Sequence, residues 1–122
     1  MSAIGGIVGI NGASVNSEDF LVLGQALNER GPDGGNDVYL GSVAMIHRAF
    51  HTNRHSRREK QPLIDANERI LAWDGRLDNR EELLKSLSHE CSNDETDVSI
   101  VLAAFNKWGI DFLQHVIGDF AL

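Results

Sequence analysis

Cysteine is nearly absent from this chain of 122 residues, in which Cys91 is the only one and lies in the polar stretch 88–93. A single thiol cannot form an internal disulfide, so a small scaffold held together by disulfides is excluded. The same scarcity favours a reducing compartment, and we expect a cytoplasmic protein. Cys91 itself is interpreted as an incidental thiol.

Positive charge is also scarce. Eleven Lys and Arg are outnumbered by 18 Asp and Glu, which gives a formal net charge of −7. Proteins that bind nucleic acid need a dense positive surface to displace counterions from phosphates. Nucleic acid is therefore not expected as a partner, and any basic site must be local.

Long hydrophobic runs are missing as well. The apolar run over residues 3–10 is interrupted by glycine, has no basic flank and is too short to cross a bilayer. We expect neither a signal peptide nor a membrane helix, and no membrane partner. Repeats and low-complexity segments are absent too, and a composition of 42% hydrophobic and 24% charged residues favours one compact soluble domain.

The chain does have a strand at its very start. Ile and Val alternate with glycine over residues 4–10, which is typical of a buried strand passed closely by another backbone or a ligand. Because chain ends fray unless they are tied down, this strand indicates that the terminus is needed inside the fold. If the initiator Met is removed, Ser2 offers a hydroxyl nucleophile and a free α-amino group as its base. The alternative is an ordinary first strand.

Helices and strands are predicted along the rest of the chain. The first helix begins near residues 14–17, stops at Gly31, and has an apolar face of Phe20, Leu21, Leu23, Ala26 and Leu27. Further helices are expected from Asn79 to about Ser88, from about Thr96 to Gly109, and briefly after Gly109. Asn79 with Glu82 three residues later predicts a capping box. Strands are predicted over 38–40 and 43–46 as a hairpin, over 69–73 ending in Asp74-Gly75, and over 116–122. Residues 61–64 are expected to return to the core.

Residues 47–60 concentrate three of the five His and five of the eleven Lys and Arg. On a helix, His47, His51 and His55 would align as metal ligands. The segment follows a strand and has little apolar periodicity, so a solvated basic loop is the ordinary interpretation. The stronger functional alternative is an anion-binding loop, whose arginines hold a carboxylate or phosphate. A nucleic-acid module here has only charge in its favour.

Seven short motifs follow one another at characteristic spacings. They are residues 2–7, Arg30-Gly31-Pro32-Asp33-Gly34, Gln61-Pro62-Leu63, Asp74-Gly75, residues 79–83, Asp97, and Gly118-Asp119-Phe120-Ala121. Together they closely resemble the N-terminal glutamine amidotransferase domain of asparagine synthetases, over the whole chain. The resemblance implies an α+β fold of the N-terminal-nucleophile type, a four-layer αββα sandwich whose first strand presents the catalytic terminus. It also implies that residues 1–122 are a type 2 glutamine amidotransferase domain that stops before its second sheet is complete.

The resemblance assigns the catalytic terminus to Ser2 and the oxyanion hole to Asp74 and Gly75. The family has Cys at the first of these positions and Asn at the second. A hydroxyl is a poorer nucleophile than a thiol at neutral pH, and an ionised Asp can only accept hydrogen bonds. Asp74 would therefore repel the oxyanion that the family's Asn stabilises.

Substrate binding departs from the family in a similar way. The Arg that grips the glutamine α-carboxylate falls at Ala49, with Arg48 one place early, and a one-residue offset on a strand reverses the side chain. Arg76 stands where the family has Glu. Asp97 matches the acid that holds the α-amino group. Arg48, Arg76 and Asp97 are therefore the candidate substrate-binding residues.

These departures favour a degenerate glutaminase domain with a structural or regulatory role for an ATP-dependent synthetase domain outside this chain. The alternative is an active amidotransferase or amidohydrolase that uses Ser2, with carboxylate binding taken over by Arg48, Arg76 or the basic loop. No cofactor or metal is expected in this domain, and ATP and Mg are implied for the synthetase domain alone. The expected partners are a glutamine-like amino acid, the synthetase domain and further copies of the chain in a homo-oligomer.

Overall fold

The structure is a computed structural model that describes residues 2–92 and 94–122. Its α-helices are α1 (Ser17–Asn28), α2 (Arg80–Ser86) and α3 (Asp97–Trp108), and three short 3-10 helices lie at Ile10–Gly12, Ser56–Arg58 and Gly109–Gln114. The described strands form three small antiparallel sheets. This mixture of separate helices and antiparallel strands confirms the α+β class.

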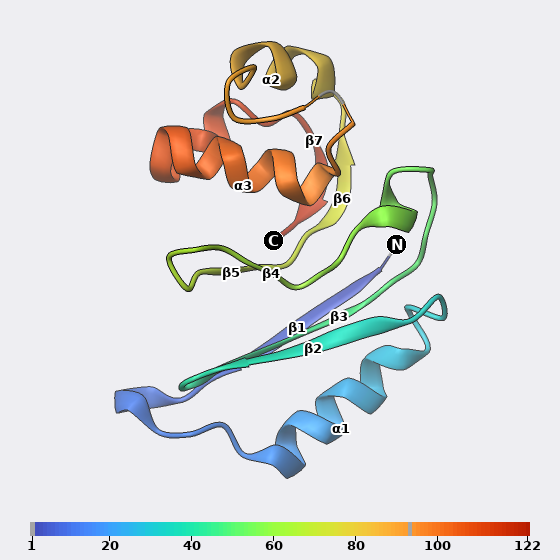
Figure 1. The fold of residues 1–122 in the computed structure, drawn as a ribbon. Helices are drawn as coiled ribbons and strands as arrows, with labels where there is room; N and C mark the ends of the chain where they lie inside the picture. Colours follow the sequence, from blue (N-terminus) through green and yellow to red (C-terminus); the bar gives the residue numbers. More distant parts are fainter. Residues whose placement is uncertain (1, 93) are drawn as a thin grey trace.

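The largest sheet contains β1 (Ala3–Val8), β2 (Gly35–Leu40) and β3 (Val43–Arg48) in the order β1-β3-β2. The predicted hairpin is confirmed, because β2 and β3 are joined at Gly41, whose φ of 60° suits a residue without a side chain. Helix α1 covers one face of this sheet, and the rest of the chain lies beyond the other face (Figure 1). The strand predicted at the terminus is therefore the first strand of the main sheet.

Helix α1 packs on the sheet through a narrower face than the sequence predicts. Asn16 caps it by accepting hydrogen bonds from the backbone N–H groups of Glu18 and Asp19, at 2.8 and 3.1 Å. Phe20 is buried against Ala44 and Ile46 of β3, with Leu23 and Leu27 beside them. Leu21 is 60% exposed and Ala26 is also exposed, so their assignment to the apolar face was wrong. The helix has a single sheet as its neighbour, which covers only one side of it.

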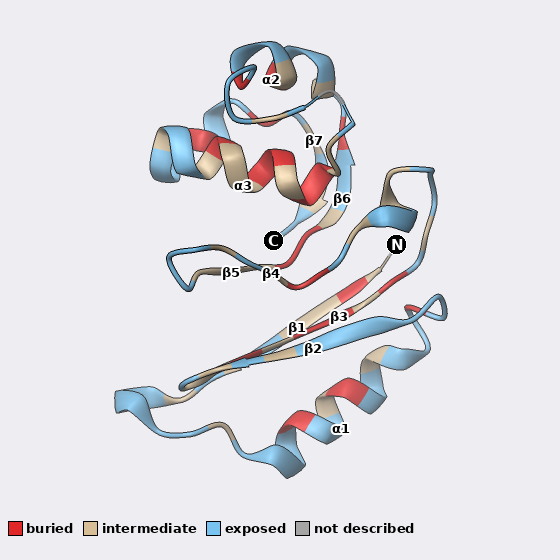
Figure 2. Ribbon diagram, viewed as in Figure 1, coloured by how far each residue is buried: buried red, intermediate tan, exposed pale blue. Residues whose placement is uncertain are grey.

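The remaining strands are short and belong to two further sheets. β4 (Leu63–Ile64) pairs with β5 (Ile70–Leu71), and β6 (Asp74–Leu77) pairs with β7 (Gly118–Ala121). In Figure 1 β4 and β5 lie between the three-stranded sheet and α3, whereas β6 and β7 lie beside the helices α2 and α3. Figure 2 shows buried residues of this half on α2, on α3 and in the segments next to β4 and β6. The core here contains Trp73, Leu77, Leu83, Leu87, Val98, Ile100, Val101, Ala104, Phe112 and Val116.

Two local predictions were wrong for tertiary reasons. The strand predicted over 69–73 pairs only at Ile70–Leu71, and Asp74 begins a new strand whose partner is β7. Asn79 stands at the start of α2 but forms no capping bond. Its side chain instead donates to the carbonyl of His115 at 2.8 Å and accepts from the backbone N–H of Ile117 at 2.9 Å. Those bonds fasten α2 to the segment that leads into β7.

No helix in the described part of the chain is long and apolar enough to cross a membrane.

A pair of leucine truncations tests this burial pattern. Leu83→Ala removes a side chain that is 2% exposed and should lower the free energy of unfolding by about 2–5 kcal/mol, because the core cannot close the cavity. Leu21→Ala is the matched control on another helix and should change stability by less than about 0.5 kcal/mol. Urea titration of both variants measures the difference, and equal losses would contradict the exposure of Leu21.

Candidate active site

The residues predicted for the catalytic centre lie together at the N-terminal end of β1. The backbone N–H of Ser2 donates a hydrogen bond to Oδ1 of Asp74 at 2.9 Å, across 72 positions of sequence. Ser2 directly precedes β1 and Asp74 opens β6, so two different sheets meet at this bond. Ser2, Asp74 and Gly75, which the resemblance assigns to the catalytic site, therefore lie next to one another.

These residues form one wall of a pocket of about 490 Å³. The lining consists of Ser2, Phe50, Thr52, Asn53, Ser56, Glu59, Trp73, Asp74, Gly75, Arg76, Asp97 and Asp119. The volume lies within the range usual for sites of small molecules. The pocket therefore joins the strand ends to the 50–59 loop and to the first turn of α3.

The hydroxyl of Ser2 is oriented by the backbone. Its Oγ accepts a hydrogen bond from the N–H of Phe50 at 3.0 Å, which leaves the hydroxyl proton free to be donated. Gly75 follows Asp74 at a place with no room for a side chain. A Cβ there would lie 2.5 Å from the carbonyl oxygen of Asp119 and 2.5 Å from Cβ of Phe120. The close pairing of β6 with β7 thus requires glycine beside the pocket.

Asp97 enters the pocket from the first residue of α3, where the positive end of the helix favours a carboxylate. Its side chain is buried and accepts a hydrogen bond from Nη1 of Arg80. The other terminal nitrogen of Arg80 donates to the carbonyl of Glu95. Asp97 therefore lines the same pocket as Ser2, with its charge already balanced by a neighbouring guanidinium.

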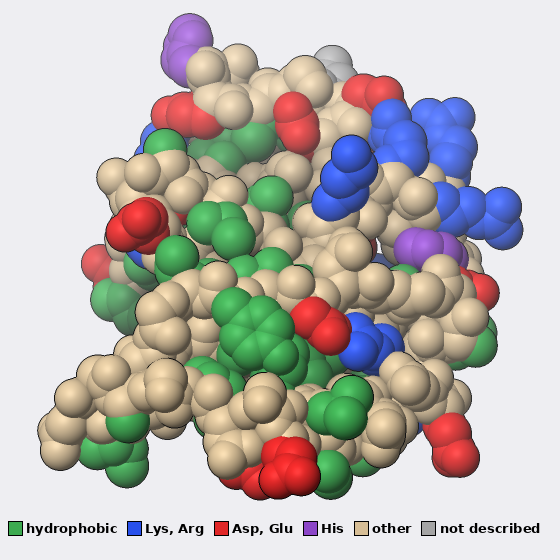
Figure 3. Space-filling model, turned by 60° about the horizontal axis from the view of Figure 1, so that its bottom comes forward, with side chains coloured by type: hydrophobic (Ala, Val, Ile, Leu, Met, Phe, Trp, Pro, Cys, Tyr) green, Lys and Arg blue, Asp and Glu red, His purple; other side chains and the backbone are tan. Residues whose placement is uncertain are grey.

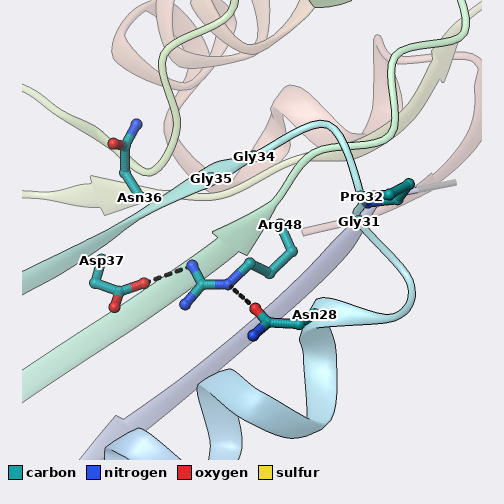
Figure 4. Close-up of a pocket in the computed structure, with 8 residues that line it drawn as sticks. All are labelled: Asn28, Gly31, Pro32, Gly34, Gly35, Asn36, Asp37 and Arg48. Carbon is teal, nitrogen blue, oxygen red and sulfur yellow. Dashed lines mark hydrogen bonds and ion pairs between the residues drawn. The ribbon is translucent and has the colours of Figure 1, made fainter.

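Arg48 is not brought into this pocket. It lies near the end of β3 and faces α1, where Nε donates to Oδ1 of Asn28 at 2.7 Å and Nη1 donates to Oδ1 of Asp37 at 2.6 Å. Figure 4 shows the guanidinium between these two side chains, in a separate open pocket of about 570 Å³. The glycine-rich turn lies against the same strand end, because a Cβ on Gly31 would be only 2.2 Å from the carbonyl carbon of Arg48. Arg48 thus connects α1, β2 and β3.

Arg76 lies at the rim of the pocket of Ser2. Its side chain is 65% exposed and forms ion pairs with Asp78 at 2.5 Å and with Asp119 at 3.3 Å. The hydrogen bond from Arg76 to Asp78 is the main cause that raises the pKa of Arg76 above its ordinary value. This arginine is the one basic side chain among the described residues that line the pocket.

Glu59 and Trp73 line the pocket, and Gln61 binds both of them, but no site was predicted at any of these three residues from the sequence. Burial raises the pKa of Glu59, against the effect of a hydrogen bond that it accepts from Nε2 of Gln61 at 2.8 Å. Oε1 of the same glutamine accepts from the backbone N–H of Trp73 at 2.6 Å. The indole Nε1 of Trp73 is buried and has no hydrogen-bond partner among residues 2–92 and 94–122. The only sequence signal was the Gln61-Pro62 motif, which the hydrophobic pattern assigned simply to the core.

The histidines of the 47–60 segment do not line up as ligands. His47 belongs to β3, and His51 and His55 lie in the loop beyond it, which confirms the loop interpretation. Among residues 2–92 and 94–122, no group of three His, Cys, Asp or Glu side chains is placed to hold a metal ion. His47 is buried, and its Nε2 has no hydrogen-bond partner in the part of the chain that the structure describes. Burial lowers the pKa of His47, although the nearby Asp74 acts in the opposite direction.

Part of the basic loop is held in place by an aspartate. Arg58 donates from Nη1 and Nη2 to the two carboxylate oxygens of Asp94, at 2.5 and 2.8 Å, and Arg54 lies 3.9 Å from the same group. Figure 3 shows Lys and Arg side chains gathered at one edge of the molecule, on the side where this loop runs in Figure 1. The loop is therefore fastened beside the pocket that it helps to line.

Comparison with known proteins adds two findings. The profile of a family described as "Glutamine amidotransferase domain" matches residues 1–122. The protein named "Asparagine synthetase [glutamine-hydrolyzing] 1" from Arabidopsis thaliana is 26% identical in an alignment of 121 positions that covers 95% of this chain. The match covers 20% of that relative, so the chain spans about a fifth of its length.

The lowered pKa of His47 predicts a specific pH dependence of stability. The unfolded chain binds a proton near the ordinary pKa of histidine, whereas the folded chain does so only at lower pH. Stability should therefore fall as the pH drops from about 7.5 to about 5. His47→Phe should remove this component, while contributions of opposite sign, such as that of Glu59, remain in both proteins. Urea unfolding midpoints at the two pH values measure it, and identical slopes for the two proteins would contradict it.

Proposed function

Since the chain belongs to the glutamine amidotransferase domain family, we propose that it is a degenerate member, related to asparagine synthetases, that has kept the fold and lost glutamine hydrolysis. Its role is then structural or regulatory for an ATP-dependent synthetase domain. The proposal includes the four-layer N-terminal-nucleophile architecture and a cytoplasmic location. One observation carries it, namely the position and bonding of the Asp74 carboxylate.

Asp74 lies where the family's mechanism requires a hydrogen-bond donor. Its Oδ1 accepts the backbone N–H of Ser2, so a negative charge lies directly beside the nucleophile position. A tetrahedral intermediate formed at Ser2 would place its own negative charge next to this carboxylate. Loss of one oxyanion donor costs about 2.7–4 kcal/mol of transition-state stabilisation, and replacing it by an anion costs more.

The carboxylate anchor for glutamine is also missing from the pocket. Arg48 is committed to Asn28 and Asp37 on the α1 side of the sheet. Ala49, at the family's anchor position, has no polar side chain. Among the described residues that line the pocket, Arg76 is the one basic side chain, and it is shared between Asp78 and Asp119. A zwitterionic amino acid would therefore bring its carboxylate to a wall that is largely negative.

The alternative function, an amidohydrolase that uses Ser2, has one observation in its favour. The N–H of Phe50 fixes the Ser2 hydroxyl at the pocket wall, with its proton available. Removal of the initiator Met would add the α-amino group that such enzymes use as a base. Activity assays separate the two functions directly.

The first expected outcome is that the protein releases no glutamate from glutamine above the rate of its Ser2→Ala variant. The measurement is glutamate formation, with an unrelated primary amide as the control substrate. Mass spectrometry of the N-terminus establishes whether Met1 is present, and both forms are assayed. Robust turnover that disappears in Ser2→Ala would establish the amidohydrolase and reject the degenerate site.

A rescue series tests the reason for the inactivity. Ser2→Cys alone should stay inactive, because Asp74 still repels the oxyanion. Ser2→Cys combined with Asp74→Asn and Ala49→Arg supplies the thiol, the donor and the anchor together. We expect the triple variant to exceed the single one by at least about 10²-fold in glutamate formation. Equal rates for the folded single and triple variants would show that Asp74 and Ala49 are not the cause.

A further inference from the structure

The contact between the backbone nitrogen of Ser2 and the carboxylate of Asp74 has a chemistry that depends on Met1. While Met1 is attached, this nitrogen is a neutral amide, and it donates a hydrogen bond to Oδ1 of Asp74 at 2.9 Å. After removal of Met1 the same nitrogen is the α-amino group of the chain, with an ordinary pKa of about 7.7–8.0. A donor that already points at the carboxylate would then become an ammonium.

Asp74 has no other cation to balance its charge. Among residues 2–92 and 94–122 it forms no ion pair with a Lys, Arg or His side chain. Arg76, two positions further along β6, is paired with Asp78 and Asp119. His47 of β3 lies near Asp74, but burial lowers its pKa, so its ring is neutral where an α-amino group titrates. The α-ammonium is therefore the counterion that the geometry offers.

The other carboxylates of the pocket wall act on the chain end in the same direction. Glu59 comes from the 50–59 loop, Asp97 from the start of α3 and Asp119 from β7. Asp97 is already paired with Arg80, so its field at Ser2 is reduced. Negative charges favour the protonated form of a nearby amine, and the nearest one has the largest effect. Asp74, which accepts a hydrogen bond from the nitrogen itself, should therefore dominate.

We propose that, in the chain that begins at Ser2, Asp74 holds the α-ammonium group in an ion pair, so that the N-terminus anchors β1 to β6 and does not serve as a base. The inference deepens the proposed function and rests on it. An ammonium has no lone pair with which to accept the proton of the Ser2 hydroxyl, whose Oγ is held by the N–H of Phe50. One carboxylate would thus disable the base as well as the oxyanion position.

The test measures protonation of the α-amino group directly. A chain that begins at Ser2 is released from a fusion protein by a protease that cuts immediately before this residue, and mass spectrometry verifies the new terminus. With ¹³C-labelled serine and aspartate, the Cα signal of Ser2 and the Cγ signal of Asp74 are followed by NMR between about pH 6 and about pH 10, a range that spans the ordinary pKa of an α-amino group. The chain that keeps Met1 is the blank, because its Ser2 nitrogen is an amide and does not titrate.

We expect the midpoint of the Ser2 titration to lie at least about one pH unit higher in the parent than in Asp74→Asn, which is a tenfold difference in proton affinity. Asp119→Asn is the matched control. It removes the same charge from a side chain of the same pocket that is 90% exposed, and it should move the midpoint by less than about 0.3 pH unit. The Cγ signal of Asp74 should change at the same pH as the Cα signal of Ser2, because each group senses the charge of the other.

The possible results separate this inference from the proposed function. A parent midpoint at or below the ordinary value, or the same midpoint in folded Asp74→Asn, would show that the ion pair is wrong. If Asp74→Asn does not fold, the Cγ signal of Asp74 in the parent decides the matter, and the absence of a change at the Ser2 midpoint rejects the pair. An ordinary midpoint without glutamate formation would leave the degenerate function standing. A raised midpoint together with robust glutamine hydrolysis would reject that function and leave the ion pair standing.

Discussion

The buried side-chain amide of Gln61 helps to connect the two halves of this protein. The side chain of Gln61 is 1% exposed, accepts the backbone N–H of Trp73 and donates to Glu59, while its backbone carbonyl accepts the side-chain amide of Asn36 at 3.4 Å. Through these contacts Gln61 touches the core that contains Trp73, the pocket wall at Glu59, and the edge strand β2 of the main sheet at Asn36. Because a buried polar group is costly unless every bond is made, the three regions must take up their positions together. The pocket of Ser2 lies among them and inherits that rigidity.

The charge of the pocket follows from how its walls are assembled. Asp74 opens a strand, Asp97 opens a helix and Glu59 ends the basic loop, so three separate elements each bring a carboxylate to one space. The arginines nearby are used to fasten elements to one another, as Arg48 does for α1 and β2 and Arg80 does for α3. Arg48 and Arg80 are thus used in contacts between elements, whereas the carboxylates of Glu59, Asp74 and Asp97 line the pocket. Such a surface selects against the acidic end of an amino acid.

The sequence predicted the features that depend on local chemistry. The first strand, the hairpin at Gly41, the start of the first helix within residues 14–17 and the start of α3 near Asp97 all have short-range signals, and the structure confirms them. The resemblance to the family implied that Ser2 and Asp74 belong to one site, and the two residues are hydrogen-bonded. What failed depended on partners distant in sequence: the side chain of Asn79 serves the 115–117 segment, and β6 separates from β5 because β7 pairs with it. The roles of Glu59, Gln61 and Trp73 likewise follow from packing that no periodicity encodes.

The nitrogen of Ser2 lies so close to Asp74 that the presence or absence of Met1 determines the charge at the pocket wall. With Met1 attached, that nitrogen is a neutral amide donor at 2.9 Å from the carboxylate. Cleavage after Met1 would convert it into an ammonium at the same place, and the protein would then carry its own counterion. N-terminal processing would thereby exchange an open anionic site for a self-neutralised one. A purification tag joined to the chain before Ser2 would begin at the pocket wall. A tag is therefore better placed elsewhere in the chain.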